Sequence, residues 1–135
     1  MNDFGVIKVR IDADVNPTED LEKVMVAVKN IFGEFPLEVK DEADRKRLFG
    51  EKEGLEPLLK LQEILRIERI RDAARALLMS SVEDEEINFY INKQAAYCGH
   101  VSFSQSSGES PLGPIHVNIR CDRPKVLIEW LTSKT

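Results

Sequence analysis

The chain has 135 residues, of which 42% are hydrophobic and 32% are charged, as expected for one globular domain over residues 1–135. Its apolar runs fall short of the roughly 18 residues that span a bilayer, its first residues do not form a signal-peptide pattern, and its two cysteines do not make a disulfide framework. We therefore expect a cytoplasmic protein without a membrane partner, and the formal net charge of −5 argues against strong non-specific binding of nucleic acid.

The N-terminal part predicts a strand followed by a helix. Apolar and polar side chains alternate over residues 5–12, which is typical of a strand with one buried face. A helix is expected over residues 16–33, with Asn16 as its N-cap, Glu19 at the capping-box spacing and Gly33 at its end.

The middle of the chain predicts two short strands, over residues 35–42 and 46–54, and then two helices over residues 55–80. At about 100° per residue, the leucines before Arg66 fall on one side of a continuous helix and the apolar residues after it fall nearly opposite. This switch favours two helices, or one sharply kinked helix, over a single straight one.

The C-terminal part predicts three more strands, over residues 86–92, 101–105 and 115–121, because each alternates between apolar and polar side chains. Residues 106–114 are rich in Gly, Pro and Ser and predict a hairpin loop. Asp122 is expected to cap a final helix.

The alternation fails between the first two of these strands, in the stretch NKQAAYCG. Asn92 can cap a single helical turn there, the alanines suit a helix, and Gly99 can end it. The whole order of elements predicts an α+β fold, with a largely antiparallel sheet and helices packed on one face.

Several patterns resemble metal or catalytic sites and have simpler explanations. Asp12 and Asp14 resemble the start of a calcium loop, but the required Gly and Glu further along are absent. Four consecutive carboxylates, at residues 83–86, are typical of a solvated loop. The arginines of residues 66–75 resemble an RNA-binding stripe, although i,i+3 salt bridges on an exposed helix explain much of it.

The two cysteines and two histidines are close in sequence, but we expect no metal and no cofactor. On a regular strand His116 and Cys121 point to opposite faces, so they would not share a zinc ion. Cys98 and His100 could approach each other as a nucleophile and base, but the sequence shows no recognisable third group to orient the histidine. We therefore expect no catalytic residues.

A surface of polar side chains is the feature that remains. If the strands share one sheet, its uncovered face carries one acidic residue, Asp12, among uncharged and basic ones. Such a face could bind RNA by stacking on Tyr90, could pair with a second copy in a homodimer, or could simply be solvated. Its other outward residues are Lys8, Arg10, Asn88, Tyr90, Asn92, Ser102, Ser104, His116, Asn118 and Arg120.

Four segments resemble an archaeal uncharacterised protein family, number 0201 in the UPF series. They are INKQAAYCGHVSF, PLGPIHVNI, the helical LLKLQEILRIERIRDAARALL and the closing IEWLTSKT, and the similarity covers essentially the whole chain. The resemblance implies a predicted RNA-binding protein with an α+β fold like that of a double-stranded-RNA-binding domain or of the ribosomal protein called L-five. It implies no catalytic residues.

The sequence thus predicts a non-enzymatic binding protein, with RNA bound through the open sheet face as the first hypothesis. A homodimeric scaffold or adaptor, whose sheet face is a protein–protein interface, is the alternative. The residues expected to contact RNA or a partner subunit are Lys93, Gln94, Asn92, Tyr90, Arg120, His116, Lys8 and Arg10.

Overall fold

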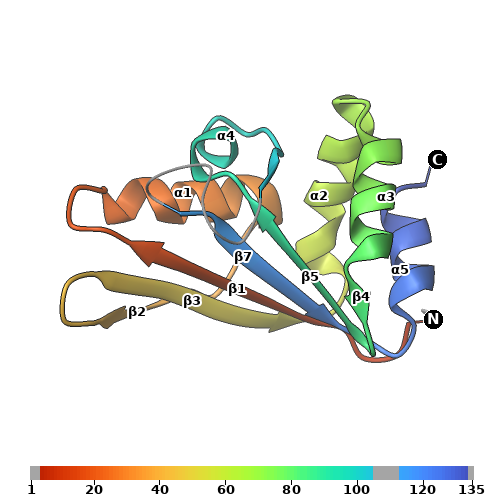
Figure 1. Ribbon diagram of the computed structural model, residues 1–135, viewed down its shortest axis with the longest axis horizontal. Helices are drawn as coiled ribbons and strands as arrows, with labels where there is room; N and C mark the ends of the chain where they lie inside the picture. Colours follow the sequence, from red (N-terminus) through yellow and green to blue (C-terminus); the bar gives the residue numbers. More distant parts are fainter. Residues whose placement is uncertain (1–3, 105–112, 134–135) are drawn as a thin grey trace.

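The computed structural model describes residues 4–104 and 113–133 and confirms the predicted α+β fold. In the described part of the chain, the helices all lie on one face of a seven-stranded sheet and leave the other face uncovered (Figure 1). No helix in these two ranges is long and apolar enough to cross a membrane. The predicted hairpin loop over residues 106–114 falls largely outside the described residues.

Every strand pairing is antiparallel, and the strand order is β2-β3-β1-β7-β5-β4, with β6 also paired to β5. The first strand in the sequence, β1, therefore lies in the middle of the sheet between β3 and β7. The strands are β1 (Lys8–Val15), β2 (Glu38–Asp41), β3 (Lys46–Glu53), β4 (Val82–Glu83), β5 (Glu86–Ile91), β6 (Phe103–Ser104) and β7 (Ile115–Arg120).

The predicted alternation sets which side of each central strand is buried. In β1, Val9 and Ile11 are at most 1% exposed, whereas Lys8 and Arg10, which alternate with them, are exposed. The inward residues of β5 and β7 are likewise buried beneath the helices. Burying these aliphatic side chains between sheet and helices supplies the main driving force for the fold.

The helices are α1 (Leu21–Phe32), α2 (Glu56–Ile67), α3 (Arg71–Ser80), α4 (Lys93–Tyr97) and α5 (Pro124–Leu131). Helix α1 starts later than predicted, because Asp20 rather than Asn16 accepts the N-cap hydrogen bond, from the backbone N–H of Glu22 at 2.9 Å. Gly33 ends α1 with a positive φ of 72°, as predicted. Asp122 does not cap α5, whose N-cap is Arg123.

The prediction of two helices over residues 55–80 is confirmed. They separate at residues 68–70, just after the predicted switch, and Arg69 there adopts a left-handed φ of 59°. Leu58 and Leu65 of α2 are fully buried, as are Ala74 and Leu78 of α3, so each helix turns its own apolar side toward the core.

The helical turn predicted after β5 is also confirmed. Asn92 Oδ1 accepts a hydrogen bond from the backbone N–H of Ala95 at 2.9 Å, and Gly99, with a φ of 82°, follows the end of α4. Asn30 of α1 donates through Nδ2 to the carbonyl oxygens of Ala96, at 3.1 Å, and Tyr97, at 2.9 Å. These contacts attach α4 to α1 on the helix-covered side of the sheet.

Candidate nucleic-acid interface

The uncovered sheet face is built from rows of side chains that cross the strands. Residues that are directly opposite on antiparallel strands share a face and lie about 5 Å apart at their Cβ atoms. One row contains all three outward aromatic rings of the described central strands, and a second row of polar residues runs beside it. The first row is Glu38, Phe49, Asp12, His116, Tyr90 and Ser104, and the second is Glu51, Arg10, Asn118 and Asn88.

Tyr90 and His116 form a stacked pair in the first row. Their ring centroids are 4.7 Å apart and the ring planes differ by 20°. His116 Nε2 donates to Asn88 Oδ1 at 2.9 Å, and the same oxygen accepts from Asn118 Nδ2, also at 2.9 Å. These amide contacts fix the orientation of the imidazole, and the two stacked rings form a partly exposed aromatic pair on the sheet, which we call the platform.

Burial lowers the pKa of His116 from its ordinary value of 6.5, against an opposite effect of the nearby Asp12 carboxylate. The neutral imidazole is therefore favoured in the folded protein. Its contribution to stability is complete above about pH 6.5 and is lost as the pH falls through the folded-state pKa.

We expect His116→Phe to lose less unfolding free energy than the wild type when the pH falls from about 7.5 to about 5.5. Phenylalanine keeps a ring beside Tyr90 but cannot take up a proton. Urea unfolding at both pH values measures this difference. His100→Gln is the matched control, because the His100 side chain is 66% exposed; the same pH dependence in wild type and His116→Phe would contradict the assignment.

The expectation of an uncharged-to-basic face is wrong, because β3 lies next to β1 and brings its own charges. Glu51 and Glu53 face outward beside Arg10 and Lys8. Arg10 Nε lies 3.1 Å from Glu51 Oε1. Positive and negative side chains therefore alternate across this part of the sheet, and much of its basic charge is already neutralised.

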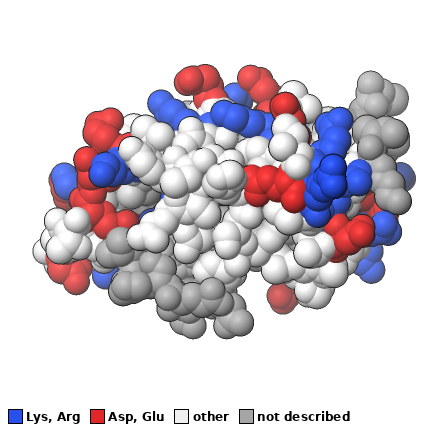
Figure 2. Space-filling view, turned by 90° about the horizontal axis from the view of Figure 1, so that it is seen from above, with Lys and Arg blue, Asp and Glu red and all other residues white. Residues whose placement is uncertain are grey.

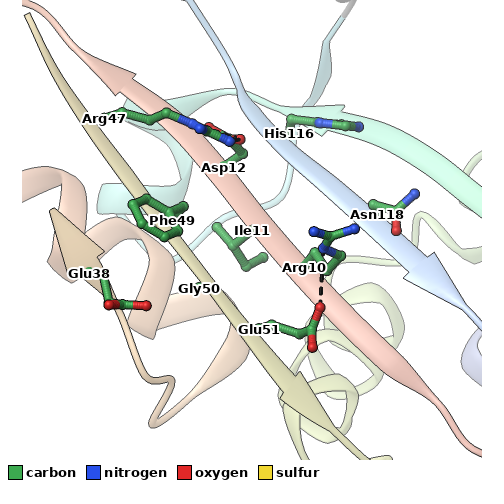
Figure 3. Close-up of a pocket in the computed structure, with 10 residues that line it drawn as sticks. All are labelled: Arg10, Ile11, Asp12, Glu38, Arg47, Phe49, Gly50, Glu51, His116 and Asn118. Atoms are coloured by element: carbon green, nitrogen blue, oxygen red, sulfur yellow. Dashed lines mark hydrogen bonds and ion pairs between the residues drawn. The ribbon is translucent and has the colours of Figure 1, made fainter. Parts of the chain in front are cut away.

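A hollow of about 510 Å³ opens on this face between β3, β1 and β7 (Figure 3). Arg47 lines this hollow, and its Nε donates to both carboxylate oxygens of Asp12, at 2.9 and 3.0 Å. The Asp12 hydrogen bond and charge raise the pKa of Arg47 above its ordinary value. The lining residues are Arg10, Ile11, Asp12, Glu38, Arg47, Phe49, Gly50, Glu51, His116 and Asn118.

Five of the predicted contact residues belong to the uncovered face. Tyr90 and His116 form the platform, Arg10 lines the hollow, and Lys8 lies opposite Arg120 at the end of β1. Neither Lys8 nor Arg120 forms an ion pair with another residue in the described ranges.

The other three predicted residues do not belong to the uncovered face. The expectation that Lys93 is available there to RNA or a partner subunit is wrong. Lys93 is 6% exposed on the helix-covered side, where its ammonium lies 3.0 Å from Glu19 Oε1 and also donates to the carbonyl oxygen of Asp14. Asn92 caps α4, and Gln94 is exposed beside α1. The polar stretch therefore anchors a helix, because its lysine finds a buried carboxylate partner.

The sequence reasoning missed Glu38, Arg47, Phe49 and Glu51 as members of the face. The signal was present, because Arg47, Phe49 and Glu51 alternate along the predicted strand over residues 46–54. What the alternation could not show is that this strand pairs with β1 rather than lying at a distance from it.

The cysteine and histidine geometry partly differs from expectation. Cys121 is buried and His116 faces outward, as predicted for a regular strand. His100 does have an orienting carboxylate, since its Nδ1 lies 2.9 Å from Glu68 Oε2 at the end of α2. The absence of a third group was therefore a wrong expectation, and it failed because Glu68 is 32 residues away in sequence.

The helix-covered side presents a different surface. Seen from that side, the coloured side chains lie mainly toward its margins, and uncharged side chains occupy most of its middle (Figure 2). The predicted stripe of arginines is also divided: Arg75 pairs with Glu129 of α5, and Arg71 Nη1 donates to the carbonyl oxygen of Ser133 at 3.2 Å. This side therefore shows no continuous basic surface among the described residues.

The chain is similar to a described protein family and to proteins of known sequence and structure. A family model described as RNA binding matches residues 8–121. A UPF0201 protein of Sulfolobus acidocaldarius is 42% identical over 128 residues, which are 95% of this chain and 88% of that protein, and one of Sulfurisphaera tokodaii is 43% identical with the same coverage. The crystal structure of a UPF0201 protein from Methanococcus jannaschii is 34% identical, with a TM-score of 0.82 over 93% of this chain and 99% of that one.

Proposed function

This chain belongs to the UPF0201 family and matches a family model described as RNA binding, and from that premise we propose that it binds single-stranded RNA on its uncovered sheet face. The stacked Tyr90–His116 pair carries the proposal. Unpaired bases stack on aromatic rings of exposed sheets, whereas bases in a duplex are already stacked on one another.

The surroundings of the platform support contacts to bases more than contacts to phosphates. Asn88 and Asn118 offer amide groups next to the rings, and amides can both donate to and accept from base edges. Arg10 and Arg47 are already bound to carboxylates. Lys8, Lys40 and Arg120 form no ion pair within the described ranges and remain for phosphate oxygens, which is too few for the extended backbone contacts of double-stranded RNA binding.

We expect Tyr90→Ala to weaken binding of a single-stranded RNA oligomer by roughly 5- to 150-fold, the range that corresponds to losing one stacked base. Fluorescence anisotropy with a labelled oligomer of mixed sequence measures the affinity, and a duplex of the same sequence should bind more weakly. Tyr97→Ala is the matched control, because it removes the chain's other tyrosine, which is exposed on the helix-covered side.

The salt dependence separates base contacts from phosphate contacts. With these three cations of the described face, the logarithm of the association constant should fall with the logarithm of salt concentration with a slope of about −2.1. The same face would be buried in a homodimer, so the oligomeric mass is measured in the same samples. A stable dimer that binds no RNA would refute the proposal.

A further inference from the structure

The hollow on the sheet face lies directly beside the ring platform, since His116 belongs to both. From His116 the first row leads through Asp12 to Phe49, two strand spacings or about 10 Å away. An RNA strand lying across the sheet would therefore pass from the Tyr90–His116 platform into the hollow. The volume of about 510 Å³ lies within the usual range for small-ligand sites.

The charges of the hollow are unsuited to phosphate. Three carboxylates line it, from Asp12, Glu38 and Glu51, and its two arginines are each bound to one of them. Glu38 forms no ion pair with another residue in the described ranges, and its side chain points from β2 toward β3 (Figure 3). A ligand group that enters here should carry N–H donors rather than negative charge.

One RNA base fits this requirement better than the others. Guanine carries two adjacent donors on its Watson–Crick edge, N1–H and the N2 amino group, which match the two oxygens of a carboxylate. In adenine and cytosine the amino group lies next to an acceptor nitrogen, and in uracil the single N–H lies between two carbonyl oxygens. A carboxylate would therefore face an unfavourable acceptor in each of those three bases.

We propose that the hollow binds a guanine base of single-stranded RNA, with Glu38 accepting hydrogen bonds from N1–H and N2–H. Phe49, opposite Glu38 in the pairing of β2 with β3, supplies the ring against which the base lies. The guanidinium carbon of Arg47 lies over one face of the Phe49 ring, 5.3 Å from its centre, so Arg47 forms one side of the site and the base lies against the rest of the ring. This inference rests on the proposed RNA binding and adds a base preference to it.

Oligouridine strands that each contain one central guanosine, inosine or adenosine test this inference. The wild type should bind the guanosine strand about tenfold more tightly than the adenosine strand. Inosine lacks only the N2 amino group and should fall in between. Glu38→Gln should remove the preference, because an amide offers one acceptor where the carboxylate offers two.

Glu53→Gln is the matched control, because Glu53 also faces outward from β3 but does not line the hollow. Equal affinity for the three strands, with the effect of Tyr90→Ala intact, would overturn the guanine site and leave RNA binding standing. If free guanosine monophosphate binds as tightly as the guanosine strand, the site recognises a free nucleotide. That result would overturn the proposal that the guanine belongs to an RNA strand. No binding of any strand would overturn the proposed function itself.

Discussion

Lys93→Met is expected to destabilise the protein by about 3–5 kcal/mol, which would lower the melting temperature by roughly 10–20 °C. The reason is that the substitution leaves a carboxylate without its counter-charge inside the protein. The side chains of Lys93 and Glu19 are each 7% exposed, and Nζ lies 3.0 and 3.2 Å from the two carboxylate oxygens. Differential scanning calorimetry and urea unfolding measure the change.

Controls separate the buried pair from ordinary surface ion pairs. Arg10→Met breaks an exposed pair with Glu51 and should cost at most about 1 kcal/mol. The double variant Lys93→Met/Glu19→Gln should recover part of the loss, because it removes the unpaired charge. A cost for Lys93→Met no greater than that for Arg10→Met would contradict the buried-pair assignment.

The same experiment bears on function, because Lys93 lies on the side of the sheet away from the proposed RNA face. Folded Lys93→Met protein should bind single-stranded RNA as the wild type does. The polar stretch around α4 is then explained by its structural contacts: Asn92 caps the helix, and Lys93 ties its first turn to Glu19 and to the end of β1.

Local patterns predicted most of the fold. The alternation in β1, β5 and β7 predicted which side chains face the helices, and the change of stripe near Arg66 predicted the break between α2 and α3. These features follow from interactions between residues near in sequence, or from the simple requirement that an apolar side be buried.

The features that the sequence did not predict depend on contacts between segments that are distant in the chain. A lysine in the first turn of a short helix is usually solvated, and only the fold brings Lys93 to Glu19, 74 residues earlier. Glu19 was expected to help cap α1, and it does accept from the backbone N–H of Asn16 at 3.0 Å, but the helix begins after it. The mixed charge of the sheet face likewise arose from the pairing of β3 with β1.

Gly50→Ala is the second substitution expected to have a large effect, about 3 kcal/mol of lost stability, at the upper end of the range for overpacking. Gly50 pairs with Ile11 and faces the helix-covered side of β3. A Cβ atom there would lie 2.0 Å from the carbonyl oxygen of Pro36 and 3.2 Å from Cε1 of Phe35. A backbone carbonyl cannot rotate away as a side chain can, so the segment before β2 would have to move.

That movement connects stability with the proposed guanine site. Pro36 precedes Glu38 by two residues, so displacing it shifts the carboxylate that is proposed to recognise the base. We expect Gly50→Ala to melt roughly 10 °C lower and to lose the preference for guanosine over adenosine, while the effect of Tyr90→Ala on RNA affinity persists. Glu53→Ala, at an outward position of the same strand, should change neither property. An unchanged melting temperature for Gly50→Ala would show that the chain around Pro36 yields without cost, and would contradict the close approach of the two backbones as a fixed feature of this sheet.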